Sequence, residues 1–187
     1  MSFIGIYLLT LLAAMLLVGL LKPSGKSVVA VCGTLALSVV SSVPAVGALM
    51  GQTFASGFAG SFFTGPVRVV IDPLAAWFIL VINFTMITSV LYGRQYMQAY
   101  ADRRSALSLH WMCYLLVHAA LTTICTMQNS IGFLVAWELM AFSSFVLVIF
   151  EGDKVRTIRA GVNYLIQSHI GVALLTEIGR ASCRERV

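Results

Sequence analysis

Charged side chains are scarce in this sequence. Only 10% of its 187 residues are Asp, Glu, Lys or Arg, whereas 59% are hydrophobic. Soluble domains carry roughly 25% charged residues, so this composition excludes an ordinary soluble domain. The apolar residues form continuous runs of about 20 residues, the length that crosses a roughly 30 Å hydrocarbon core as a helix. Because backbone groups in lipid must be hydrogen-bonded internally, we predict an all-α, polytopic transmembrane helix bundle.

Motifs for metals, cofactors and nucleic acids are lacking as well. The four cysteines show no CxxC or Cys/His spacing, and Cys32, Cys113 and Cys125 fall inside apolar runs, where cysteine packs as a small apolar side chain. No cluster of Lys and Arg is interleaved with aromatic residues, as a nucleic-acid surface requires. We therefore predict no metal site, no cofactor and no nucleic-acid partner, so any redox centres belong to other subunits.

Six apolar segments divide the chain. Their approximate bounds are 3–20, 28–50 with Pro44 inside, 74–92, 107–127, 130–150, and a sixth that starts near residue 160. The first segment has no basic residue before it, whereas a secretory signal carries its basic region ahead of the apolar run. We therefore predict that the first segment is a retained transmembrane helix.

The basic residues of the loops predict the orientation. With six spans, the loops after spans one, three and five share a side, and they hold eight Lys or Arg against Arg68 alone on the other side. Basic loops stay in the cytoplasm, which places the N-terminus outside the cytoplasmic (inner) membrane. The eight residues are Lys22, Lys26, Arg94, Arg103, Arg104, Lys154, Arg156 and Arg159.

The last residues differ from the rest. The string EIGRASCRERV follows Thr176 and has no apolar run. The sixth segment would then have only about 16 residues, or roughly 24 Å of helix, short of a full crossing. The end of the string also matches the translation of a common sequencing adapter. We predict that residues 1–176 are the N-terminal part of a longer membrane domain and that residues 177–187 are a non-native tail. The alternative is a native basic tail. It conflicts with the predicted topology, in which span six ends on the outer side of the membrane.

One acid lies deep in an apolar run. Glu138 is the single ionisable side chain between residues 131 and 150. A carboxylate at the centre of a membrane helix costs roughly 2.5 to 3.5 kcal/mol on insertion scales, and such residues mark functional sites. We interpret Glu138 as a proton carrier. The alternative is a structural hydrogen bond between helices.

Two histidines occur at a similar depth. Glu138 is about 12 Å from the outer edge of span five, and His118 and His169 are each about 16 Å from the inner edge of spans four and six. Histidine titrates near neutral pH, so the three side chains can form a relay with intervening water. Each histidine can instead simply bond across helices.

Three stretches carry a resemblance. VAWELMAFSSFVLVIF resembles the fifth transmembrane helix of the antiporter-like membrane subunits of NADH:quinone oxidoreductase, of group 4 hydrogenases and formate hydrogenlyase, and of multisubunit cation/proton antiporters. VRVVIDPLAAWFILVI is similar to the start of the third helix in that family, a short extended stretch followed by an Asp and the span. Asp72 suits the N-cap and Pro73 the first turn. NYLIQSHIGVALL is most similar to the hydrogenase and formate hydrogenlyase branch.

The resemblance implies a function. In the family, the Glu that matches Glu138 pairs with a Lys on the seventh helix, and no Lys falls inside a predicted span here. The intact protein is then expected to be a roughly fourteen-helix, proton-translocating and non-catalytic subunit. Its partners would be other membrane and peripheral subunits of a respiratory or hydrogenase complex, whose redox chemistry drives it.

Two other functions stay open. One is a subunit of a multisubunit cation/proton antiporter without redox partners. The other is a membrane scaffold in which Glu138 is structural. Neighbouring genes would separate the redox complex from the antiporter, and a Lys in the next two spans would favour transport.

Overall fold

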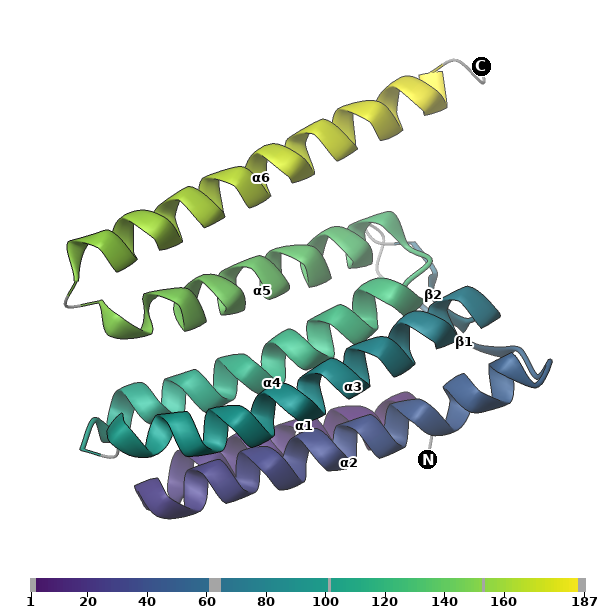
Figure 1. Ribbon diagram of the computed structural model, residues 1–187. Coiled ribbons are helices and arrows are strands. Elements are labelled where there is room, and N and C mark those ends of the chain that lie inside the picture. Colours follow the sequence, from purple (N-terminus) through teal and green to yellow (C-terminus); the bar gives the residue numbers. More distant parts are fainter. Residues whose placement is uncertain (1–2, 61–64, 101, 153, 185–187) are drawn as a thin grey trace.

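The chain folds into long helices joined by short turns and one small hairpin. A computed structural model describes residues 3–60, 65–100, 102–152 and 154–184 (Figure 1). Its helices are α1 Phe3–Leu20, α2 Pro23–Leu49, α3 Pro73–Tyr96, α4 Arg104–Thr126, α5 Ser130–Val148 and α6 Val155–Arg184, with short 3-10 turns η1 Met97–Tyr100 and η2 Ile149–Glu151.

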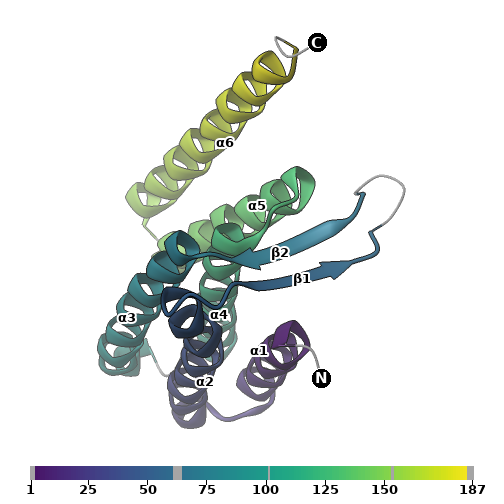
Figure 2. The same ribbon diagram turned by 90° about the vertical axis from the view of Figure 1, so that its right-hand side faces the viewer.

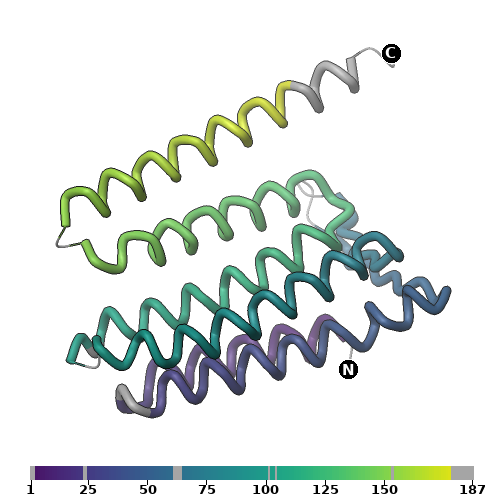
Figure 3. The backbone as a smooth tube through the Cα atoms, in the orientation of Figure 1, coloured from purple at the N-terminus to yellow at the C-terminus, as the bar shows by residue number. Residues whose placement is uncertain are grey.

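The helices α1 to α4 form a bundle, and α5 and α6 are added at one side. The helix α2 packs against α1, α3 and α4, whereas α5 packs against α4. The helix α6 packs against α5 and stands away from the rest (Figure 2). The tube trace shows that α1 starts at the same end of the bundle as the hairpin (Figure 3).

Five of the helices are long and apolar enough to span a membrane, among the residues that the structure describes. These are α1, most of α2, α3 with η1, α4, and α5 with η2. The sixth predicted span is also a helix, of 30 residues, but it falls short in apolar character. Its polar residues Asn163, Gln167, Ser168 and His169 explain the difference. The all-α, polytopic bundle predicted from the sequence is confirmed.

The helix α6 also runs past the predicted boundary at residue 176. It continues to Arg184, through most of the segment that we predict to be a non-native tail. Helical conformation does not depend on the origin of a segment, so the division of the chain at that residue stays a prediction.

Helix starts follow the capping signals. The Asp72 side chain accepts a hydrogen bond of 2.7 Å from the Ala75 backbone N–H, and Pro73 occupies the first turn of α3. Asn129 accepts one of 2.9 Å from the Gly132 N–H at the start of α5. The N-cap predicted at Asp72 is therefore confirmed.

A hairpin connects α2 and α3. The strands β1 Phe54–Phe58 and β2 Val67–Ile71 pair antiparallel, with Phe54 opposite Ile71. The sequence predicts extended backbone just before Asp72, which is β2, but not the partner strand. Figure 2 shows the hairpin projecting across one end of the bundle.

Small residues let the helices of the bundle approach one another. A Cβ atom added at Gly33 of α2 would lie 2.9 Å from the Ala14 Cβ atom of α1. Trp111 of α4, which is fully buried, fills the space between α4 and Gly93 of α3. Close contacts of this kind stabilise helix packing in lipid, where the hydrophobic effect does not act between helices.

Candidate functional site

The structure brings Glu138 and His169 together. The Oε2 atom of Glu138, on α5, lies 3.1 Å from the Nε2 atom of His169, on α6. Both residues occur in the middle of their helices, eight and fourteen residues after the first residue. The sequence places these two residues and His118 at one depth, and the turn between α5 and α6 brings Glu138 and His169 into contact.

The hydrogen bond of the second ring nitrogen of His169 shows which ring nitrogen carries a hydrogen in the neutral ring. Its Nδ1 atom lies 2.8 Å from the Leu165 carbonyl oxygen. A carbonyl oxygen can only accept, so Nδ1 carries a hydrogen and donates it. The Nε2 atom of a neutral ring is then an acceptor. A hydrogen bond to Glu138 therefore needs one further proton, which is on either the carboxyl group or the ring.

The Glu138 and His169 side chains are partly exposed on the surface of helices α5 and α6. The side chains of Glu138 and His169 are 43% and 54% exposed in this chain. Exposed apolar side chains surround them on both helices, namely Val135, Leu139, Phe142, Ile166 and Ile170. The pair thus lies on a face that lipid or another transmembrane helix covers in a membrane. Intramembrane acids are rare on lipid faces and mark functional positions.

A glycine sets the approach of α6 to α5. A Cβ atom added at Gly161 would lie 2.4 Å from the Ile149 Cγ2 atom and 3.2 Å from the Phe145 ring. No side chain larger than hydrogen fits there without a shift of the helices. Gly161 therefore fixes the crossing that brings His169 towards Glu138.

His118 lies elsewhere. It is fully buried on α4, and its Nε2 atom lies 2.9 Å from the Asn83 Oδ1 atom of α3. The Asn83 amide nitrogen in turn donates to the Ser38 carbonyl and to the hydroxyls of Ser41 and Ser42, all on α2. The relay expected among three residues thus becomes one pair on α5 and α6 and a separate network across α2, α3 and α4.

Sequence reasoning missed two residues. Asn83 is 3% exposed and lies in the middle of the third helix. Its position as an isolated polar residue in an apolar run is the sequence signal that could have identified it. Lys26 was placed in a loop, but it lies in the first turn of α2, 4% exposed, and donates a hydrogen bond to Ser108 of α4. A lysine therefore does lie within a helix of this chain, because α2 begins five residues earlier than predicted.

Polar contacts of Glu151 join two turns at the end of the bundle opposite the hairpin. Glu151, in the turn after α5, accepts a hydrogen bond from the Tyr100 hydroxyl and pairs with Lys154. The Phe150 ring packs edge-on against Tyr100 and His110. These contacts fasten the α3–α4 turn to the α5–α6 turn. Across the described residues, no three His, Cys, Asp or Glu side chains gather as metal ligands.

Five helices that are long and apolar enough to span a membrane define a polytopic membrane protein, among the residues that the structure describes. No family model matches the sequence. The chain is 31% identical over 125 residues to hydrogenase-4 component B of Escherichia coli K12, a match that covers 67% of this chain and 18% of that protein. The chain belongs to the family of antiporter-like membrane subunits, as this similarity and those to two further relatives show.

Two relatives carry another name. The chain is 29% identical over 96 residues to NADH-quinone oxidoreductase subunit N of Azoarcus sp. BH72, which covers 51% of this chain and 19% of the relative. It is 28% identical over 123 residues to subunit N of Rubrobacter xylanophilus, covering 65% and 24%. The matched regions thus span less than a quarter of the length of these curated relatives.

Proposed function

We propose that this chain is part of a subunit that translocates protons across the cytoplasmic membrane, driven by redox chemistry on partner subunits. Glu138 is the proton carrier and His169 its exchange partner. The observation that supports this proposal is the 3.1 Å contact between them within helices α5 and α6. The names of the relatives, a hydrogenase component and a quinone oxidoreductase subunit, favour the redox complex.

One proton can move between the two groups without a change in the net charge of the pair. With the proton on Glu138, both groups are neutral. With the proton on His169 Nε2, a carboxylate faces an imidazolium. Moving that proton between the two groups changes which helix carries it, and water or a neighbouring polar group can then take it. The exposed side of the pair leaves room for such a neighbour.

Transport needs an external energy source. Moving one charge against 100 mV costs about 2.3 kcal/mol, which a proton pair cannot supply by itself. We propose that other membrane and peripheral subunits of a respiratory or hydrogenase complex supply it through their redox centres. In this scheme the subunit itself is non-catalytic and holds no cofactor.

Glu138→Gln tests the role of the pair in the whole subunit within its complex. Glutamine keeps the shape of the side chain and its hydrogen-bonding capacity but cannot release a proton. We expect redox-driven proton uptake by inverted vesicles to be abolished, with normal subunit content. Glu138→Asp should retain part of the activity, because the acid survives on a shorter arm.

A scaffold role gives the opposite pattern. Glu138→Gln would then pump normally, and Glu138→Ala would reduce the amount of assembled complex because the hydrogen bond is lost. Full pumping by Glu138→Gln therefore excludes the carrier role. A cation/proton antiporter without redox partners would instead exchange cations for protons in the absence of any reductant.

A further inference from the structure

Buried polar side chains follow one face of α2 through the bundle. Lys26, Thr34, Ser38 and Ser41 are spaced by eight, four and three residues, which keeps them on one side of a helix. All four are at most 4% exposed. Of the described side chains, none bonds the Thr34 or Ser38 hydroxyl, and burial without a partner is costly in an apolar environment.

Helix α4 presents a matching set. Ser108 accepts the hydrogen bond from Lys26, and Trp111, His118 and Thr122 follow on the same face. The Trp111 Nε1 and His118 Nδ1 atoms are buried and have no partner in the described part of the chain. Helices α2 and α4 pack against each other, and both carry buried polar atoms without a partner in the described part of the chain.

The network around Asn83 determines the state of His118. The Asn83 amide nitrogen donates to the Ser38 carbonyl, which can only accept, so the Asn83 oxygen is the atom that faces His118. His118 Nε2 must then carry the hydrogen. In the neutral ring this leaves Nδ1 with a lone pair, buried and ready to accept a proton or a water hydrogen.

The polar groups of the two helices follow one another along the axis of the bundle. The helices α2 and α4 run in the same direction (Figure 1), so positions along both are counted from Lys26 and Ser108. At 1.5 Å per residue, Trp111 lies about 4 Å along the axis, Thr34 about 12 Å, His118 about 15 Å, and Ser38 about 18 Å. Trp111 can only donate a hydrogen bond, so the longest step between groups that both accept and donate runs about 12 Å along the axis, from Ser108 to Thr34, and about four waters span it.

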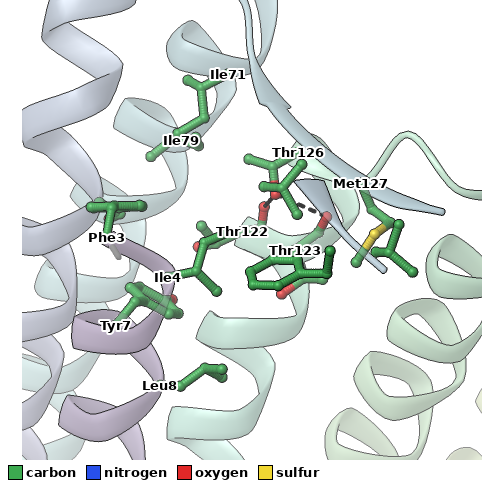
Figure 4. Close-up of a pocket in the computed structure, with 14 residues that line it drawn as sticks. Phe3, Ile4, Tyr7, Leu8, Ile71, Ile79, Thr122, Thr123, Thr126 and Met127 are labelled. Atoms are coloured by element: carbon green, nitrogen blue, oxygen red, sulfur yellow. Dashed lines mark hydrogen bonds between the residues drawn. The ribbon is translucent and has the colours of Figure 1, made fainter. Parts of the chain in front are cut away.

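A hollow opens at the hairpin end of this column. It has a volume of about 270 Å³, and Tyr7, Ser41, Thr122 and Thr126 line it together with apolar residues of α1 and the hairpin. Figure 4 shows Tyr7 of α1 and the threonines of α4 on opposite sides of this space. Ser41 lies both in the hollow and in the Asn83 network.

We propose that water fills this column and that it conducts protons between Lys26 and the hollow beneath the hairpin, with His118 as its titratable centre. The column gives the subunit a proton path that is separate from the Glu138–His169 pair. The physiological role of the column rests on the proposed function. Each hydroxyl or water accepts a proton on one side and releases another on the opposite side. His118 instead takes up a proton at Nδ1 and returns it from Nδ1 to another water, because its Nε2 hydrogen stays in its hydrogen bond to Asn83, so the column gains no net charge after each passage. Asn83 is a positioning residue, since its amide fixes His118 but passes no proton.

The hydration of the column can be measured directly in the whole subunit. Native cysteines are replaced by alanine, and single cysteines are introduced as Thr34→Cys and Ser38→Cys. The matched controls are Ala120→Cys on α4 and Ala141→Cys on α5, which are small and at most 1% exposed. A water-soluble methanethiosulfonate reagent should label the two column positions at least about tenfold faster, because the reactive thiolate forms where water reaches.

Conduction is tested by the flux of protons into liposomes that hold the complex, driven by a potassium diffusion potential. Thr34→Val removes the hydroxyl but keeps the shape and should lower the flux severalfold, and Thr34→Ser should restore it. Labelling of Thr34→Cys and Ser38→Cys at the control rate overturns the column. Equal flux in Thr34→Val and the unmodified protein overturns its conduction. Neither result bears on Glu138, whose failure would appear as full redox-driven pumping by Glu138→Gln with column labelling unchanged.

Discussion

At the level of single residues, two buried or half-buried histidines differ in what faces them. The Nε2 atom of His169 faces a carboxyl group, so a hydrogen bond between them needs a proton on one of the two groups. The Nε2 atom of His118 faces an amide oxygen, which can only accept, so its hydrogen stays in place. The same residue type thus faces a carboxyl group on α6, where we propose proton exchange, and is a fixed donor at Nε2 on α4, where only Nδ1 can take up a proton.

His169→Leu should reduce redox-driven proton uptake as strongly as Glu138→Gln, because the carboxyl group loses the ring that shares its proton. Proton uptake by inverted vesicles, normalised to subunit content, measures the effect. Gln167→Leu is the control, since Gln167 is also polar and exposed on α6. Normal pumping by His169→Leu would show that Glu138 exchanges its proton elsewhere.

Asn83→Leu should destabilise the subunit. It removes bonds to the α2 serines and leaves His118 Nε2 without an acceptor, which costs about 1 to 2 kcal/mol in a membrane protein. The midpoint of thermal unfolding in detergent should fall. Asn163→Leu, at an exposed position on α6, should leave it unchanged. Equal midpoints for both variants would mean that the Asn83 network contributes no stability.

At the level of elements, α6 depends on α5 for its position. It packs against α5 and the turn η2, and Gly161 lies at their closest approach. Glu138 and His169 lie on the same two helices, farther from the turn than Gly161. A change in the crossing at Gly161 therefore moves His169 relative to Glu138. The geometry of the pair is therefore a property of the helix contact as much as of the two side chains.

Gly161→Val tests this dependence. The added Cβ atom would meet Ile149 at 2.4 Å and should push α6 away, so both pumping and thermal stability should fall. Gly171→Val is a matched control on the same helix, because a Cβ atom there meets nothing within 4 Å. If the two variants behave alike, the close approach at Gly161 does not hold the pair together.

At the level of the whole molecule, the loops divide into a basic end and a hairpin end. Lys22, Arg94 and Arg103 lie at the end opposite the hairpin, near the Tyr100–Glu151–Lys154 contacts. Basic loops are retained in the cytoplasm, so we predict that the hairpin faces outwards. The proton path proposed through α2 and α4 would then lead from the cytoplasmic end to the outer surface.

Cysteine labelling in intact cells measures this orientation. Gln128→Cys lies at the hairpin end and Asp102→Cys at the basic end, and both positions are exposed and leave the Lys and Arg residues intact. An impermeant maleimide should label Gln128→Cys in intact cells and Asp102→Cys only after lysis. The reverse order would invert the topology.

The helices were predictable from the sequence because lipid allows few alternatives for an apolar run. Depth placed Glu138, His118 and His169 at one level, and the structure brings only Glu138 and His169 into contact. The partner of His118 was not predictable, because depth does not reveal the rotation of a helix, and Asn83 turns towards α2 as well as α4. The strand β1 carries no clear alternation in FASGF, so the hairpin appears only when β2 pairs with it.

The pairing of α5 with α6 has a consequence for biogenesis. The helix α6 is too polar to qualify as a span by the apolar criterion that the other five helices meet. His169, a polar position in the middle of α6, meets Glu138, and the two groups together carry no net charge whichever of them holds the shared proton. The two helices would therefore enter the bilayer more readily as one hairpin than in succession.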